Sequence, residues 1–423
     1  PVEEVNNLVS KALVALDKFK EIECQEKIDK IVHAAAVAAL DQHGPLAIAA
    51  FEETGRGLVE DKAIKNLFAC EYITNNLRDL KTVGIVDKDE SDGLTTIAEP
   101  VGVVCGIVPT TNPTSTTVFK SLICLKTRNP IIFSFHPAAN ECSKQAARIV
   151  YEAAVKAGAP EGCIQFIEKP SLDATNALMK HDGVATILAP ALGVGPGNVP
   201  AYVHKDAKLK QAVNDIVLSK AFDNGMICAS EQAAIVDTEH YKEFIELMKK
   251  HRVYFVNKEE KAKLEELVFG AKANSKNCAG AKLNADVVGK SAEHIAELAG
   301  FKVPKGTIIL AAEVKEVGEN EPLTREKLSP VIAVIKSLST EDGIEKSRQM
   351  VELNGLGHSA AVHTQDEEVA EQFGKVVPAC RILWNTPATF GGIGDVYNSL
   401  IPSLTLGCGS YGGNSVSGNI GAV

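Results

Sequence analysis

Cys228 is the residue whose setting best suits a chemical reaction. It lies in the stretch FDNGMICASEQ (222–232), directly after a turn that contains Gly225 and before the apolar run AAIV. A loop of this kind can expose a thiol to a cleft, and a thiolate is nucleophilic enough to attack a carbonyl carbon near neutral pH. A cysteine taken alone is more often a small buried hydrophobic residue. The spacing therefore makes Cys228 a candidate nucleophile and leaves the structural alternative open.

The other cysteines are spread along the chain at positions 24, 70, 105, 124, 142, 163, 278, 380 and 408. They form no C-x-x-C pair and no Cys/His cluster at zinc spacing, so we predict no metal site. Cys105 and Cys124 lie within apolar patterns and are expected to be buried. This usage indicates a reducing compartment. Because no basic-then-apolar leader begins the chain, we expect a cytoplasmic protein.

Composition narrows the class of protein. The 423 residues suit two or three folding units of roughly 150 residues each. Apolar residues make up 45% and charged residues 23% of the chain, as in a soluble globular protein. The longest apolar runs, such as 101–108, are far shorter than the roughly 18 residues that a membrane span needs. A net charge of −10 argues against nucleic-acid binding, which requires a basic surface. We therefore expect a small-molecule substrate, no nucleic acid and no membrane.

The order of the expected elements indicates an α/β protein. The hydrophobic pattern is helical to about residue 80, and a stretch near 82–100 that is rich in strand-forming residues predicts a hairpin arm. From 102 to 189, short β runs alternate with helical stretches, which predicts a parallel, doubly wound sheet. Ligands of such sheets bind at the carboxyl ends of the strands, so we expect a dinucleotide near the loops 109–117, 136–140 and 189–200.

Three polar residues outside the cysteine loop could take part in chemistry. Asn112 follows an apolar strand, where its amide could donate to developing negative charge or only shape a turn before Pro113. His358 lies in the Gly-flanked stretch GLGHS, where an imidazole titrating near neutrality could exchange a proton or play a structural part. Composition alone makes Glu326 a solvated charge.

Several long motifs carry a resemblance to a known family. FDNGMICASEQ resembles the nucleophile signature of aldehyde dehydrogenases, in the form typical of the CoA-acylating branch. Four further stretches resemble the aldehyde dehydrogenase half of bifunctional aldehyde-alcohol dehydrogenases, so the resemblance covers nearly the whole chain: AEPVGVVCGIVPTTNPTSTTVFKSLICLKTRNPIIFSFHP, EPLTREKLSPV, GLGHSAAVHT and NTPATFGGIGDVYN.

This resemblance implies a fold and a domain division. It implies an aldehyde dehydrogenase-like α/β fold with a Rossmann-type NAD-binding domain over 1–200, from which a β arm near 82–100 projects for oligomerisation. A catalytic thiol domain follows over 201–385, and a C-terminal return and tail occupies 386–423.

The resemblance also implies catalytic roles. Cys228 would form a thioester, and Asn112 would complete an oxyanion hole with the cysteine's backbone N–H. Glu326 would accept hydrogen bonds from the nicotinamide ribose, since two carboxylate oxygens suit two hydroxyls. His358 would exchange a proton with CoA or with the thiohemiacetal oxygen.

The remaining cofactor contacts are expected at the strand exits. Pro109 and Thr110 follow the first strand, and His136 stands where many family members have a lysine that reaches the adenosine ribose. The choice between NAD and NADP is therefore open, and we expect NAD. Gly193 and Gly195 belong to the turn GVGPGN. Gly193 occupies the position at which hydrolytic members carry a water-activating glutamate, so a thioester here would persist for the CoA thiol.

One departure from the family is large. Family members have a glycine-rich turn and a helix between VATILA and ALGVG, whereas here Ala189 runs directly into Pro190. A crossover between parallel strands needs roughly 10 to 12 residues. Either the segment is truly deleted, which would put cofactor binding in doubt, or it is a mobile loop that is missing from the sequence between Ala189 and Pro190; we favour the mobile loop.

The resemblance implies an NAD-dependent, CoA-acylating dehydrogenase that interconverts acetaldehyde or another short aldehyde and acyl-CoA, with NAD as cofactor and CoA as co-substrate. It also implies a homo-oligomer, and the glycine-rich tail ends about where relatives continue toward an iron-dependent alcohol dehydrogenase domain. Three alternatives remain: a hydrolytic dehydrogenase, a filament scaffold domain, and a cysteine acyltransferase without a redox step.

Overall fold

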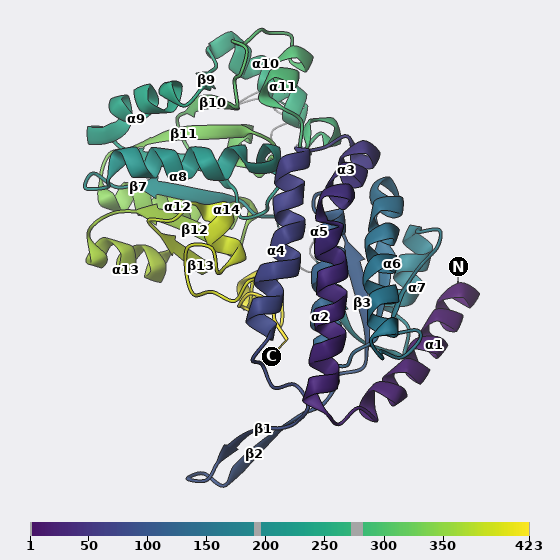
Figure 1. Cartoon of the computed structure of the whole chain (residues 1–423). Coiled ribbons are helices and arrows are strands. Elements are labelled where there is room, and N and C mark those ends of the chain that lie inside the picture. The colour runs from purple at the N-terminus through teal and green to yellow at the C-terminus, as the bar shows by residue number, and fades with distance from the viewer. Residues whose placement is uncertain (1, 190–195, 272–281, 423) are drawn as a thin grey trace.

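The computed structural model describes residues 2–189, 196–271 and 282–422. Two lobes lie side by side, with a long hairpin projecting from their base (Figure 1). The strands of the four-stranded sheet all lie before residue 189, and those of the seven-stranded sheet all lie after residue 198. The sequence prediction of an α/β fold with parallel sheets is confirmed.

The first lobe is a four-stranded parallel sheet wrapped by helices. Its strands run in the order β5-β4-β3-β6. Val103 to Val108 is a continuous apolar run that is almost entirely buried, as expected of a strand covered on both faces. The strands are β3 (Val103–Val108), β4 (Ile131–Phe135), β5 (Ile164–Phe166) and β6 (Val184–Leu188), and the helices are α1 (Val2–Lys20), α2 (Gln25–Asp41), α3 (His43–Thr54), α4 (Val59–Leu77), α5 (Pro113–Lys126), α6 (Asn140–Lys156) and α7 (Leu172–Met179).

Helical periodicity explains how this lobe packs. In α2, the buried residues Ile28, Ile31, Ala35 and Ala39 recur at three- and four-residue spacing, which places them on one face. That face joins a core shared with α4, α5, α6 and the strands β3 and β4. The predicted burial of Cys105 and Cys124 is confirmed.

The projecting arm is an antiparallel hairpin of β1 (Gly84–Asp89) and β2 (Leu94–Ala98). It extends away from both lobes (Figure 1). Three of its apolar side chains are more than half exposed: Ile85 at 54%, Leu94 at 63% and Ile97 at 58%. The hairpin predicted near 82–100 is present, and its apolar side chains face solvent in the single chain.

The second lobe is built on a seven-stranded parallel sheet in the order β13-β12-β7-β8-β11-β10-β9. Its central strands are buried along their whole length. The strands are β7 (Val199–Val203), β8 (Glu231–Asp237), β9 (Val253–Phe255), β10 (Ile309–Val314), β11 (Val331–Ser337), β12 (Gly357–His363) and β13 (Ala379–Trp384), and the helices are α8 (Leu209–Ala221), α9 (Thr238–Lys250), α10 (Lys258–Phe269), α11 (Ala292–Leu298), α12 (Thr340–Asn354), α13 (Glu367–Val376) and α14 (Ala388–Ile393).

After α14 the chain returns to the junction between the lobes (Figure 1). This return contains little regular structure, with a bridge between Leu406 and Asn419. The sequence analysis gave 386–423 as a C-terminal return and tail, and α14 lies at the start of that stretch. Among the helices that the structure describes, none is both long and apolar enough to cross a membrane.

Candidate active site

Cys228 lies in a turn between α8 and β8, at the junction of the two lobes. The turn begins with a short 3₁₀ helix, Phe222–Gly225, in which Asp223 (φ 46°) and Asn224 (φ 54°) adopt left-handed conformations. Aspartate and asparagine tolerate this region better than most residues do. The buried carboxylate of Asp223 accepts a hydrogen bond from the N–H of Leu58 (2.7 Å). The first lobe therefore holds the turn that presents the cysteine.

The Cys228 side chain is partly exposed, unlike most of the described cysteines. Desolvation, followed by the negative charge of Glu326, raises the pKa of the thiol to about 12, and the nearby Arg381 opposes this shift. The thiol is therefore protonated near neutral pH in the protein alone. Reaction requires a proton acceptor or added positive charge at the site, because the thiolate is the nucleophile.

Asn112 occupies the N-cap position of α5, directly after β3. Its Oδ1 accepts a hydrogen bond from Lys65 Nζ (2.7 Å), and the same ammonium donates to the carbonyl of Met226 (3.3 Å). Met226 precedes the cysteine by two residues, so this lysine brings Asn112 and the Cys228 turn together. Asn112 and Cys228 were predicted to share a site, and the structure brings them there.

Lys65 was missed by the sequence prediction. The residues Lys62, Lys65 and Asn66 of α4 are all buried, on the face that also carries Ala69 and Ile73. The signal was present in the sequence, because this spacing places two lysines on the apolar face of a helix. A lysine is seldom buried without a partner, and here the partner, Asp223, is distant in sequence.

Glu326 lies beside the thiol. Its Oε1 accepts a hydrogen bond from the N–H of Gly197 (2.9 Å), and a β-carbon at Gly197 would lie 1.8 Å from the Cys228 carbonyl oxygen. Desolvation raises the pKa of Glu326 to about 7, against the opposing effects of that N–H and of two buried lysines. Its Oε2 accepts no hydrogen bond from any residue that the structure describes, so one oxygen is available to a ligand.

Gly197 is expected to be intolerant of any side chain. In Gly197→Ala, the new methyl group would overlap the Cys228 carbonyl, so the turn must shift. We expect kcat to fall roughly 10²-fold and the free energy of unfolding to fall by about 1–3 kcal/mol, measured by steady-state kinetics and denaturant unfolding. Gly44→Ala is the matched control because nothing lies within 4 Å of its β-carbon position. Equal kinetics for the two variants would contradict the close approach.

His358 lies beside Arg381, whose charge also acts on the Cys228 thiol, and one expectation for the histidine was wrong. It is only 1% exposed, and desolvation, followed by the charge of Arg381, lowers the pKa of the imidazole to about 3. The ring is therefore neutral near pH 7 instead of titrating there. Its Nδ1 lies 3.1 Å from Ser359 Oγ, and Nε2 has no partner within the described chain. A neutral ring can still accept a hydrogen bond from a ligand.

Arg381 was also missed. From β13 it donates to the carbonyl oxygens of His358 and Gly407, both at 2.7 Å, and to Ser359 Oγ (3.1 Å). It is buried and carries positive charge close to the Cys228 thiol. This guanidinium joins β12 to the C-terminal return and fixes the backbone at His358.

Three of the predicted cofactor residues, Pro109, Thr110 and His136, lie at the carboxyl edge of the four-stranded sheet. Pro109 and Thr110 follow β3, and Thr110 Oγ1 accepts a hydrogen bond from Arg56 (3.0 Å). His136 follows β4 and is exposed; desolvation, followed by the charge of Arg56, lowers its pKa. Gly193 and Gly195 lie outside the described residues.

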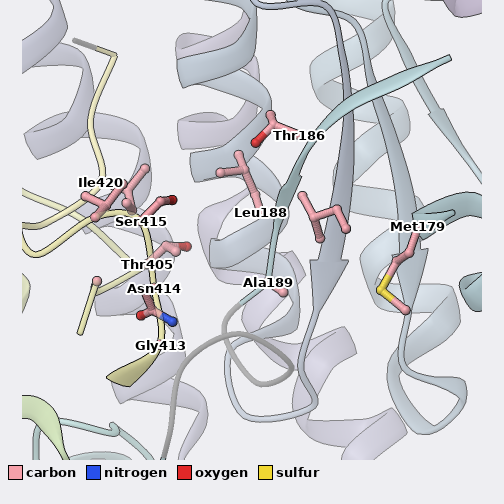
Figure 2. Close-up of a pocket in the computed structure, with 12 residues that line it drawn as sticks. Met179, Thr186, Leu188, Ala189, Thr405, Gly413, Asn414, Ser415 and Ile420 are labelled. Carbon is pink, nitrogen blue, oxygen red and sulfur yellow. The ribbon is translucent and has the colours of Figure 1, made fainter. Parts of the chain in front are cut away.

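A cavity of about 330 Å³ opens between the end of β6 and the C-terminal return (Figure 2). Thr186, Leu188 and Ala189 line one side, and Thr405, Asn414 and Ser415 of the return line the other (Figure 2). Gly407, which binds Arg381, also lines it. The cavity therefore lies next to Arg381, whose charge acts on the Cys228 thiol. Its volume is large enough for part of a nucleotide.

The described residues contain no group of three or more histidine, cysteine, aspartate or glutamate side chains that could hold a metal ion. The polar groups around Cys228 instead comprise an amide, a carboxylate, a neutral imidazole and a guanidinium. These groups suit the binding of an organic substrate and the stabilisation of developing charge.

Comparison with curated proteins gives long matches. The chain is 66% identical to an aldehyde-alcohol dehydrogenase of Streptococcus pneumoniae, covering 99% of this chain and 49% of that protein. It is 47% identical to a bifunctional aldehyde-alcohol dehydrogenase of Escherichia coli, covering 99% and 48%. The chain thus spans about half the length of these relatives. A succinate-semialdehyde dehydrogenase (acetylating) of Clostridium kluyveri is 35% identical, with 98% and 92% covered.

Solved structures agree with this likeness. An acetylating aldehyde dehydrogenase from Geobacillus thermoglucosidasius has a TM-score of 0.94 and 44% identity, covering 100% of this chain and 94% of that one. A propionaldehyde dehydrogenase from Rhodopseudomonas palustris, solved with bound CoA and an acylated cysteine, has a TM-score of 0.86 and 26% identity, covering 99% and 94%.

The family model for the aldehyde dehydrogenase family matches residues 1–189 and 191–395. The match is interrupted at residue 190, and the alignment with the S. pneumoniae relative spans 434 positions, more than this chain has. Both observations agree with a segment that relatives carry and this chain lacks between Ala189 and Pro190. Motifs, fold and matches together show that the chain belongs to the aldehyde dehydrogenase family.

Proposed function

We propose that this chain is an NAD-dependent, CoA-acylating aldehyde dehydrogenase module that interconverts a short aldehyde, acetaldehyde first among them, and its acyl-CoA through a thioester on Cys228. One observation carries the proposal: a partly exposed thiol in the junction between the lobes is flanked by the Asn112 carboxamide and the Glu326 carboxylate. The names of the relatives and the acylated cysteine of the R. palustris enzyme support it.

The groups at the site fit a nicotinamide cofactor. Glu326 has a free oxygen beside the thiol, as a ribose hydroxyl requires, and the edge formed by Thr110 and His136 lies where dinucleotides bind on parallel sheets. Nicotinamide, when bound, supplies the acceptor for the hydride that leaves the substrate carbon. Since relatives have a longer chain after Ala189, contacts with the pyrophosphate are expected to be weaker here.

The chain's own residues supply the remaining steps. The Cys228 thiol releases its proton to solvent as Sγ bonds to the aldehyde carbon and the carbonyl oxygen gains negative charge. Asn112 Nδ2 donates a hydrogen bond to that oxygen. Loss of hydride leaves an acyl thioester on Cys228. The CoA thiolate then attacks the acyl carbon and Cys228 leaves as thiolate. The unpartnered Nε2 of neutral His358 is suited to accept a hydrogen bond from the CoA thiol. The proton that the CoA thiol loses is taken up by the departing Cys228 thiolate, whose thiol has a raised pKa.

CoA dependence of NADH formation tests the proposal. With acetaldehyde and NAD, we expect steady turnover only when CoA is present; without CoA, a burst of at most one NADH per chain should appear, since the thioester accumulates. Steady turnover without CoA would instead establish a hydrolytic enzyme. Oligomerisation without NADH binding would favour a scaffold, and acyl transfer without nicotinamide would favour an acyltransferase.

We also propose that the chain acts in the cytoplasm as a homo-oligomer assembled through its hairpin arm, and that an iron-dependent alcohol dehydrogenase domain follows it in the native protein. The exposed apolar side chains of the arm support the first point, and the half-length matches support the second. The mass of the chain in solution, with and without residues 82–100, tests the role of the arm.

A further inference from the structure

Lys65 has an environment that the reaction so far described does not use. It lies on α4, its side chain is only 4% exposed, and its Nζ donates to three oxygens: Asn112 Oδ1 (2.7 Å), the Met226 carbonyl (3.3 Å) and Asp223 Oδ2. An ammonium has three protons, so these acceptors use all of them. Desolvation lowers the pKa of Lys65 to about 8, against the opposing charge of Asp223, so the cation predominates at pH 7.

The contact with Asn112 fixes which way its carboxamide faces. An ammonium can only donate, so the atom 2.7 Å away must be the amide oxygen, and the NH₂ group must point to the other side. There, Nδ2 makes only a 3.4 Å contact with Thr111 Oγ1. The N–H bonds are therefore available to a substrate oxygen, and positive charge on the far side of the amide strengthens them as donors.

The contact with Met226 fixes the other half of the site. Met226 precedes Cys228 by two residues, and Asp223, which also binds Lys65, begins the same turn. We propose that Lys65 is a positioning residue that sets the orientation of the Asn112 amide relative to the Cys228 turn, so that the oxyanion hole is assembled before substrate arrives. This inference rests on the proposed roles of Cys228 and Asn112.

Lys62 offers a matched control within the same turn of α4. It is equally buried, at 3% exposed, and its Nζ also bonds to Asp223 Oδ2 (3.2 Å). Within the part of the chain that the structure describes, its Nζ bonds to neither Asn112 nor Met226. Lys62→Met therefore removes a buried cation and one ion pair with Asp223 but leaves the amide contact. Any loss that comes from unpairing Asp223 should appear in both lysine variants.

The test compares Lys65→Met, Lys62→Met and both lysine variants combined with Asn112→Ala. We expect Lys65→Met to lower kcat roughly 30- to 100-fold, as part of an oxyanion-hole contribution of about 10²–10³, with KM for the aldehyde changed less than about threefold. Lys62→Met should lower kcat less than about threefold. In the Asn112→Ala background, Lys65→Met should cost less than about threefold more, because the amide it orients is gone.

Further readouts separate positioning from a general structural effect. Alkylation of Cys228 by iodoacetamide passes through no oxyanion, so the alkylation rate should be the same in Lys65→Met and in wild type.

If Lys65→Met does not fold, Lys65→Gln is used in the same cycle, since the glutamine amide keeps a neutral hydrogen-bond donor. Lys65→Gln should retain a higher kcat than Asn112→Ala. Equal losses in the two lysine variants, or an undiminished Lys65 effect in the Asn112→Ala background, would overturn the inference. Turnover that survives Cys228→Ala would overturn the proposed function itself.

Discussion

Cys228→Ala is expected to lower CoA-dependent NADH formation by on the order of 10⁴-fold or more, while the fold is retained. The reason is that the thioester forms on this thiol, and removing a covalent nucleophile is among the costliest single changes to an enzyme. Steady-state kinetics with acetaldehyde, NAD and CoA measures the loss. Mass spectrometry after incubation with acetyl-CoA should show an acyl group on wild type and none on the variant.

Cys408→Ala is the control, since this buried thiol lies near Cys228. We expect it to retain turnover within about tenfold, as a small cavity and no lost chemistry would predict. A larger loss of turnover in Cys408→Ala than in Cys228→Ala would show that Cys228 is not the nucleophile.

The raised pKa of the Cys228 thiol, about 12, adds a second check. The rate of alkylation of the protein alone should increase with pH throughout the range from about pH 7 to 10, and a plateau within that range would contradict the raised pKa.

Asn112→Ala is expected to lower kcat by about 10²–10³-fold, the usual cost of one oxyanion-hole donor. Asn112→Asp should lose more, because a carboxylate has no N–H to donate and repels the developing negative charge. Asn112→Ala should also lower the free energy of unfolding by about 1–3 kcal/mol, because it removes one acceptor of the buried Lys65 ammonium. No capping hydrogen bond is lost at the start of α5. Steady-state kinetics and thermal unfolding together measure these expectations.

Thr111→Val serves as the control for Asn112. It removes the hydroxyl that contacts Asn112 Nδ2 at 3.4 Å and nearly preserves side-chain volume. We expect kcat within about threefold of wild type. If Asn112→Ala had wild-type kcat, or if it slowed iodoacetamide labelling of Cys228 as much as catalysis, Asn112 would shape the turn and not the transition state.

Local patterns in the sequence were sufficient for most of the fold. Each predicted element depends on residues that are close together in the sequence. Examples are the buried strand β3, the helix α2 and the β1–β2 hairpin. Cys228, Glu326 and Asn112 were predicted from motifs and are brought to one junction.

The rest depended on contacts between distant segments. Lys65 and Arg381 gain their meaning only when α4 meets the Cys228 turn and when β13 meets the C-terminal return. Hydropathy indicates that Arg381 is a solvated charge. The helical spacing of Lys65 places it on an apolar face but does not indicate its partners. The neutrality of His358 likewise depends on complete burial beside a guanidinium, which nothing in the stretch GLGHS indicates.

The order of the strands has a consequence for biosynthesis. Every strand of the four-stranded sheet, and every helix around it, has been synthesised by the time residue 189 is added. In the second sheet, β7 lies between β8 and β12, so one edge of β7 stays unpaired until the chain reaches His363. Domains commonly fold as they emerge, and unpaired strand edges are prone to aggregate. While the second half of the chain is being synthesised, we therefore expect the first lobe to be folded and the second sheet to be incomplete, because β12 is not yet available to pair with β7.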